Sequence, residues 1–184
     1  LLLAIKVDND TVKGWLNNNL GNVYCYRKID FQKGIKHYKE GLKYSIQHKD
    51  EYEIMFSKLN IGSAYFAVED FSNGIQYFNE VKDYVDKEGD NEAKMSLNSN
   101  FGAYYNHLNN NQKAEEYYLK AVHFCEQNDV ELIKSNASDV YNDISNFYYK
   151  IKNFEKAHFY LLKHDELQDK IYNEERLNDV KVAG

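Results

Sequence analysis

Two small residues recur along the chain at a spacing of about 40 residues. The first follows a large apolar residue and falls at positions 21, 62, 102 and 145, so the steps are 41, 40 and 43. The second falls at positions 34, 74, 114 and 157, with steps of 40, 40 and 43. Apolar residues follow both markers at steps of three and four, which is the spacing of one helix face. Two markers that keep nearly one period predict an array of helical hairpins.

The clearest unit runs from Asn60 to Val81 and predicts a helix, a tight turn at 68–70 and a second helix. Gly62 and Gly74 lie where larger side chains on the two helices would collide. A glycine inside a helix costs up to about 1 kcal/mol relative to alanine. We therefore expect close approach of the two helices to offset this cost.

These units resemble tetratricopeptide repeats (TPRs), which carry large–Gly–x–x–Tyr on the first helix and Ala–aromatic–Ala on the second. The resemblance covers about residues 11 to 172, and the second and third units match it best. The fourth unit has Ser145 in place of the glycine and His164 in place of the last alanine, and the chain contains no proline. Each unit is about six to nine residues longer than the 34-residue form. The resemblance implies an all-α fold, a right-handed α–α superhelix of about four hairpins plus terminal helices.

We expect one helical-repeat domain over residues 1–184. Residues 1–7 are expected to end a preceding helix, and 173–184 to extend the last helix, which has no breaker before Leu177. Gly89 is the expected C-cap of the second hairpin. The repeats are expected at about 11–49, 50–90, 91–129 and 130–172. The helices are expected at 11–28, 31–48, 50–68, 71–87, 91–108, 112–127 and 130–150, with the last one starting near Asn153.

The charge and hydropathy of the chain exclude two classes of partner. The net charge is −6 and no lysine/arginine cluster appears, so no nucleic acid is expected. The longest apolar run, Leu1 to Ile5, is far shorter than the roughly 20 residues that cross a membrane, so no membrane contact is expected. The compartment stays open: the cytoplasm, or the periplasm if the chain is part of a membrane-bound sensor. Cys25 and Cys125 are expected to be free thiols.

The sequence offers no catalytic pattern. It contains no glycine-rich phosphate loop, paired-cysteine metal site or nucleophile motif. None of the six histidines lies four residues from another, and none has a metal-ligand spacing. We therefore expect no enzyme, no metal and no cofactor.

The functional signal lies on the first helix of each unit, because stacked hairpins of this kind place their first helices on the concave side. The residue before the large–small step is Asn19, Asn60, Asn100 and Asp143 in the four units. In related repeat proteins this row can hydrogen-bond the backbone of an extended peptide, since an amide supplies both donor and acceptor. The alternative is that these residues satisfy neighbouring helix ends and stabilise the solenoid.

The predicted peptide-binding groove is apolar near Phe56 and Phe66 and acidic near Asp143, and Trp15 and Asn18 neighbour it. Chaperone-binding TPRs clamp a terminal carboxylate with basic residues, but polar uncharged residues occupy the basic positions of the clamp here. A carboxylate-terminal ligand is therefore disfavoured. The predicted groove residues are Asn19, Asn22, Tyr26, Phe56, Asn60, Ser63, Phe66, Asn100, His107, Asp143, Asn146 and Tyr149.

Residues 160–175 resemble the end of TPR sensor regions in Bacteroidota-type signalling proteins. The two resemblances imply a protein- or peptide-binding module that is the regulatory or sensor part of a larger signalling protein. The alternative is a structural scaffold or oligomerisation domain with no groove ligand. Self-association through the terminal helices is compatible with either function.

Overall fold

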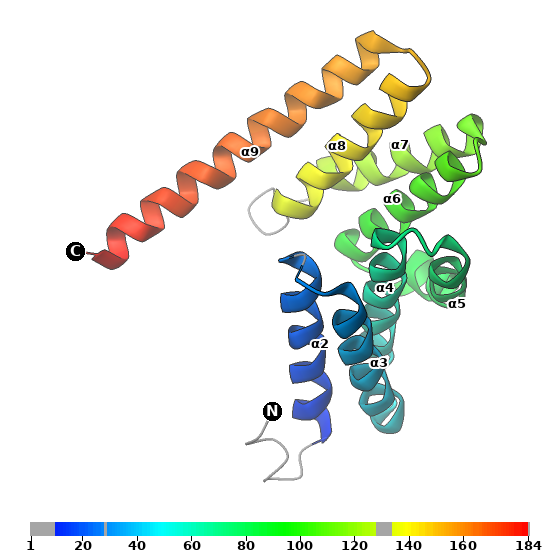
Figure 1. Cartoon of the computed structure of the whole chain (residues 1–184), viewed down its shortest axis with the longest axis vertical. Helices are drawn as coiled ribbons and strands as arrows, with labels where there is room; N and C mark the ends of the chain where they lie inside the picture. The colour runs from blue at the N-terminus through cyan, green and yellow to red at the C-terminus, as the bar shows by residue number, and fades with distance from the viewer. Residues whose placement is uncertain (1–9, 28, 128–133, 184) are drawn as a thin grey trace. The chain divides into compact units, whose positions relative to one another are not determined.

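The computed structural model describes residues 10–27, 29–127 and 134–183, and within these ranges the chain forms eight α-helices and no strand (Figure 1). This confirms the all-α helical-repeat class. The predicted helix end at 1–7 lies outside the described residues, as do positions 130–133 of the predicted helix 130–150. The helices are α2 Asp10–Tyr26, α3 Phe31–His48, α4 Glu51–Ala67, α5 Phe71–Glu88, α6 Asn91–His107, α7 Asn111–Gln127, α8 Lys134–Lys150 and α9 Phe154–Ala183.

The chain divides into two compact units, the first ending at Gly89 and the second beginning at Asp90. In the first unit α2 pairs with α3 and α4 pairs with α5, while α4 also contacts both α3 and α2. In the second unit α6 pairs with α7 and α8 pairs with α9, while α8 also contacts both α7 and α6. Each unit therefore stacks two of the predicted hairpins.

A capping residue marks the start of each second helix. The side-chain oxygens of Asp30, Asp70, Asn110 and Asn153 each accept a hydrogen bond from the backbone N–H three residues later, at 3.0–3.2 Å. These positions are 40, 40 and 43 residues apart, the same steps as the second small residue. An N-cap of this kind contributes about 1 kcal/mol to helix stability. The caps therefore repeat with the packing pattern.

The small residues of the repeat lie where two helices approach closely, as the sequence predicts. A Cβ atom added to Gly62 would lie 2.5 Å from Cε1 of Phe78, and one added to Gly102 would lie 2.7 Å from Cδ1 of Tyr118. Both aromatic side chains are buried. In the fourth repeat the Ser145 hydroxyl instead donates a hydrogen bond to the Ala157 carbonyl oxygen at 2.8 Å. A serine can therefore replace the glycine by bonding to the backbone of the facing helix.

The turns differ from the sequence expectation in one respect. Gly89 is the C-cap of α5, but its φ of −66° and ψ of 142° are extended rather than left-handed. In the described residues the left-handed conformation is taken by non-glycine residues that end or follow a helix, namely Lys49, Glu69, Asn109 and Lys152. The chain reverses direction in these turns without glycine.

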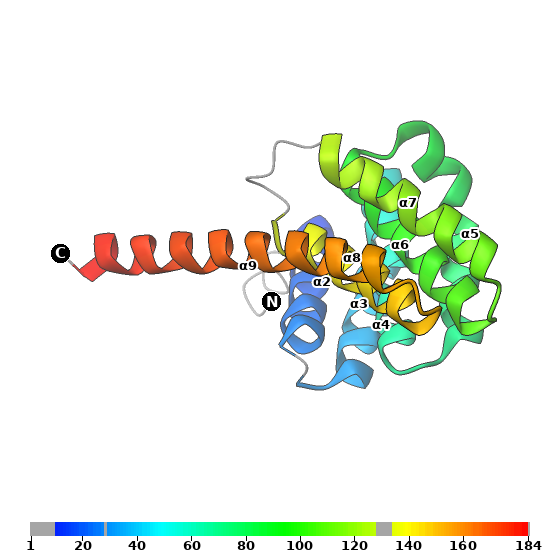
Figure 2. The same cartoon turned by 90° about the horizontal axis from the view of Figure 1, so that it is seen from above.

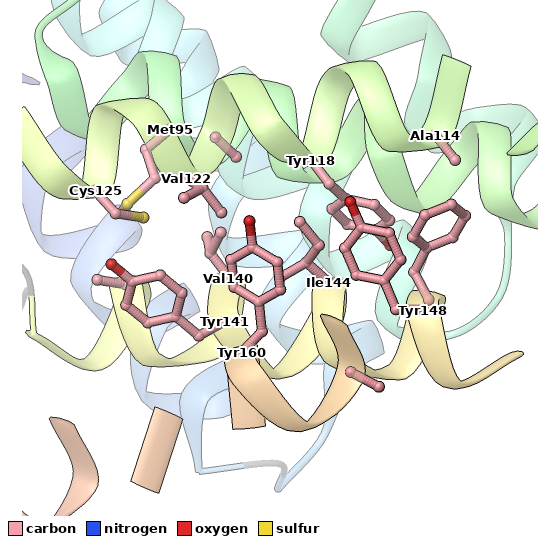
Figure 3. Packing of buried hydrophobic residues seen from close by; sticks show 14 of the residues in the cluster. Met95, Ala114, Tyr118, Val122, Cys125, Val140, Tyr141, Ile144, Tyr148 and Tyr160 are labelled. Atoms are coloured by element: carbon pink, nitrogen blue, oxygen red, sulfur yellow. The ribbon is translucent and has the colours of Figure 1, made fainter. Parts of the chain in front are cut away.

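The second unit has an aromatic core between α7, α8 and α9 (Figure 3). Tyr148 and Tyr141 stack on Tyr160, with ring centroids 5.8 and 6.4 Å apart. The 30-residue α9 runs back along α8 and continues past the N-terminal start of α8 (Figures 1 and 2). Its contribution to the core ends with Leu167 and Ile171. None of the helices in the described ranges combines the length and hydropathy that a membrane span needs.

Candidate functional site

A polar network joins the first helices of the two hairpins in the first unit. The Asn18 amide nitrogen on α2 donates to the Ser57 hydroxyl on α4 at 3.0 Å, and that hydroxyl donates back to the Asn18 amide oxygen at 3.1 Å. Asn18 also donates to Oε2 of Glu53 at 3.1 Å. Ser57 is fully buried and Asn18 is 7% exposed. This network fixes the register of α2 against α4.

The two predicted groove asparagines of the first unit lie beside this network. Asn19 directly follows Asn18, and Asn60 lies almost one turn after Ser57. Both side chains are half-buried, and neither amide has a hydrogen-bond partner among the residues that the structure describes. An amide without a partner offers two N–H donors and an acceptor oxygen to a ligand.

The corresponding residues of the second unit are engaged. The Asn100 amide nitrogen donates to the Ser96 carbonyl oxygen of its own helix at 2.9 Å. One carboxylate oxygen of Asp143 on α8 accepts a hydrogen bond from the Ser99 hydroxyl on α6 at 3.3 Å. Burial, with a smaller contribution from the charge of Asp139, raises the pKa of Asp143 to about 7. Of these contacts, the Ser99–Asp143 hydrogen bond joins α6 to α8.

Three of the remaining predicted residues make contacts inside the first unit. Asn22 accepts a hydrogen bond from the Tyr38 hydroxyl at 2.8 Å, which joins α2 to α3. The half-buried Phe56 packs on Tyr52, with ring centroids 4.7 Å apart. The placement of Phe66 in the groove is wrong, because Phe66 is buried in the α4–α5 hairpin. Its ring packs against that of Phe78, with ring centroids 5.0 Å apart.

The other predicted residues lie at or near the surface of their own unit. In the first unit Ser63 is half-buried and Tyr26 is exposed. In the second unit the Asn146 amide donates to Oδ1 of Asn142 at 3.3 Å, and His107 and Tyr149 are exposed. The structure therefore places the predicted residues in two sets, one in each unit.

A cavity in the first unit was not predicted from the sequence. Its volume is about 280 Å³, and it lies between the first turns of α2, the last turn of α3 and the start of α4. Two small residues, Gly14 on α2 and Ser45 on α3, belong to its lining. Its lining residues are Thr11, Val12, Gly14, Trp15, Tyr44, Ser45, His48, Asp50 and Glu53.

Metal binding has no support in the described ranges, where no three histidine, cysteine or acidic side chains come together to hold an ion. Cys25 and Cys125 are free thiols. Burial raises the pKa of the Cys125 thiol to about 12.

Comparison with known proteins supports the repeat assignment. Residues 96–128, on α6 and α7, match the tetratricopeptide repeat family model. No curated protein sequence matches the chain. Among solved structures, the chain is similar to the crystal structure of BtubC (BKLC) from P. vanneervenii, with a TM-score of 0.63 and 16% sequence identity. The similarity covers 86% of this chain and 64% of that one, so the chain spans less than two thirds of that protein.

At 16% identity this likeness concerns the fold alone. The family match falls on the third of the four units that the small-residue pattern defines. Together, the family match and the structural similarity support a helical-repeat protein of the tetratricopeptide type.

Proposed function

We propose that this chain binds an extended peptide segment of a partner protein on the first helices of its repeats. Tetratricopeptide repeats indicate a protein–protein interaction module. The observation that carries the finer proposal is the pair Asn19 and Asn60, two half-buried amides at equivalent positions of consecutive repeats, with no partner within the described residues.

The spacing of these two amides suits a peptide backbone. Packed helices lie about 8–10 Å apart, and an extended chain rises about 3.3 Å per residue. Asn19 and Asn60 would therefore meet peptide groups about three residues apart. Every peptide group carries one N–H and one C=O, so the amides recognise the extended backbone whatever its side chains are.

The neighbours of Asn60 on α4 add selectivity. Phe56 lies one turn before Asn60 on the same face of the helix, and Ser63 lies one turn after it. Phe56 offers a half-buried aromatic ring to an apolar side chain of the peptide. The proposed ligand therefore places an apolar residue next to the backbone group that Asn60 binds.

We also propose that this module is the regulatory part of a larger signalling protein. The resemblance of residues 160–175 to the end of TPR sensor regions supports this proposal. Sequencing the complete gene tests it. A kinase or DNA-binding output domain in the same reading frame is the expected result, and a reading frame with no output domain would overturn it.

A structural scaffold with no groove ligand is the second candidate, and the contacts of Asn100 and Asp143 favour it. At these two positions of the row the polar side chain already forms a hydrogen bond within the protein. Under this function the whole row of polar residues would stabilise the stacked helices and bind nothing.

Selection from a displayed library of random peptides, followed by NMR with the ¹⁵N-labelled chain, tests peptide binding. We expect selected peptides to shift the side-chain amide signals of Asn19 and Asn60. Asn79, an exposed residue on α5, is the internal control and its amide signal is expected to stay in place. Failure to select any binding peptide would contradict the proposal, and so would shifts confined to α3 and α5.

A further inference from the structure

The cavity of the first unit has the size of a site for one long side chain. Its volume is about 280 Å³. Pockets that enclose a drug-sized molecule measure roughly 300–1,000 Å³. The cavity therefore suits a single protruding side chain better than a free small molecule.

Aromatic and apolar groups form much of the wall. Trp15 and Val12 come from α2, and Tyr44 comes from α3. Trp15 is 57% exposed, so much of its indole ring is open to a ligand. An exposed tryptophan ring is the preferred partner of a cationic group in a cation–π contact.

Two carboxylates complete the lining. Asp50 is the N-cap of α4, and its Oδ1 accepts a hydrogen bond from the Glu53 backbone N–H at 3.0 Å. Oε2 of Glu53 accepts the Asn18 amide at 3.1 Å. These bonds hold both carboxylates in place, and a carboxylate has about four lone-pair sites, so each retains capacity to accept further bonds.

The basic groups near the cavity have their own partners. Lys13 is not a lining residue, and its ammonium group is bonded to Oδ1 of Asp10 at 2.7 Å. His48 belongs to the lining, and its Nε2 lies 3.9 Å from Oδ2 of Asp10. Both groups therefore interact with Asp10, which is not a lining residue. The lining therefore carries two acidic side chains that a cation would complement.

We propose that this cavity binds an arginine side chain of the peptide partner, an inference that rests on the proposed function. The guanidinium group is planar, stacks on aromatic rings and bonds carboxylates through two N–H groups at once. Because the Lys13 ammonium group already lies over the Tyr44 ring, 5.8 Å from its centroid, the arginine stem would pack on Trp15. Its guanidinium group would pair with Glu53 and Asp50. An acidic side chain would be repelled by the same two carboxylates.

Trp15 is the only tryptophan of the chain, so its indole NMR signal and its fluorescence report on this cavity alone. The probe is the capped tripeptide acetyl-Gly-Arg-Gly-amide, added to the full 184-residue chain. Three matched tripeptides carry citrulline, lysine or glutamate in place of the arginine. We expect a saturable shift of the Trp15 signal with arginine, a weaker one with lysine and none with citrulline or glutamate. Equal shifts with citrulline would overturn the proposal, because citrulline keeps the shape of arginine and lacks its charge.

Variants of the carboxylates locate the binding. Glu53→Gln and Asp50→Asn each remove one charge and keep an acceptor for the hydrogen bonds described above. The matched control is Glu51→Gln, which removes the same charge from an exposed residue outside the lining. We expect each lining variant to bind the arginine tripeptide at least about fivefold more weakly, as for the loss of one charge-assisted hydrogen bond, and the control to stay within about twofold. Equal weakening by Glu51→Gln would overturn the proposal, because it would show attraction to net charge only.

Failure of this inference can be told apart from failure of the proposed function. If selected peptides shift the amide signals of Asn19 and Asn60 but the arginine tripeptide does not shift the Trp15 signal, the proposal of an arginine pocket is wrong. The proposal of peptide binding is then retained. If the arginine tripeptide fills the cavity but no peptide reaches the two asparagines, peptide binding along the first helices is wrong.

Discussion

The Asn18 amide and the Ser57 hydroxyl exchange two hydrogen bonds, at 3.0 and 3.1 Å, across the contact between α2 and α4. Each group serves as donor and as acceptor, and both are buried. The pair sets α2 beside α4. Of the two asparagines that we propose bind peptide, Asn19 directly follows Asn18, and Asn60 lies three residues after Ser57.

Replacing Ser57 with alanine tests this pair. Ser57→Ala leaves the Asn18 oxygen buried without the hydroxyl donor, and a buried polar group that loses its partner costs about 1–3 kcal/mol. We expect a loss of that size in the free energy of unfolding, measured with urea. The control Ser72→Ala, at an exposed position on α5, is expected to change stability by less than about 0.5 kcal/mol. Equal effects of the two substitutions would show that the network contributes nothing.

Gly62→Ala tests the packing pattern of the repeat. The added Cβ would lie 2.5 Å from the ring of the fully buried Phe78. Alanine favours the helix by about 1 kcal/mol, but overpacking costs about 1–3 kcal/mol, and the rigid neighbours make the second effect the larger one. We expect a net loss of stability. Because the two residues are in contact, Gly62→Ala with Phe78→Leu should lose less than the sum of the single losses. Strictly additive losses would contradict this contact.

Asp143 predicts a change of stability with pH. Its pKa is about 7 in the folded chain and near 3.8 when unperturbed, so between these values the folded state binds more protons than the unfolded state. The free energy of unfolding therefore falls as pH rises from about 4 to about 7, and the loss is complete above that range. Asp143→Asn keeps the bond to Ser99 and removes this loss.

Urea unfolding at pH 4 and pH 8 measures the effect. One pKa unit corresponds to about 1.4 kcal/mol, so we expect Asp143→Asn to be at least about 1 kcal/mol more stable than the wild type at pH 8 and nearly equal to it at pH 4. Asp165→Asn, at an exposed position on α9, is the control and should show no such difference. A variant that is less stable at pH 8 would mean that the Asp143 carboxylate makes a net favourable contact.

The sequence predicts the fold because its main signals are steric and periodic. A glycine opposite a buried aromatic ring, as at Gly62 and Phe78, marks a close helix contact wherever it recurs. Phe66 shows the limit of reading one helix by itself. Phe66 lies one turn after Gly62 and therefore on the same face of α4, the face that packs against α5. The position of Gly62 in the pattern thus indicates that Phe66 is in the core.

The candidate site was predicted only in part, because the spacing of residues along the sequence does not determine which group an asparagine amide forms a hydrogen bond with. Asn60 and Asn100 occupy equivalent positions, yet Asn100 bonds to its own helix while Asn60 has no partner in the described part of the chain. The cavity at Trp15 depends on three helix segments meeting beside Gly14 and Ser45, and no single stretch of sequence contains that arrangement.

The central claim is that Asn19 and Asn60 bind the backbone of a peptide, and the double variant Asn19→Ala/Asn60→Ala tests it most directly. Calorimetry measures the affinity for a selected peptide, and Tm is measured on the same protein. Asn79→Ala is the control. Each lost hydrogen bond is worth about 0.5–1.5 kcal/mol, so we predict binding that is weaker by about tenfold or more, with Tm almost unchanged. A large fall in Tm with intact affinity would contradict the claim, because it would mean that the two amides hold the repeats together and the peptide binds elsewhere.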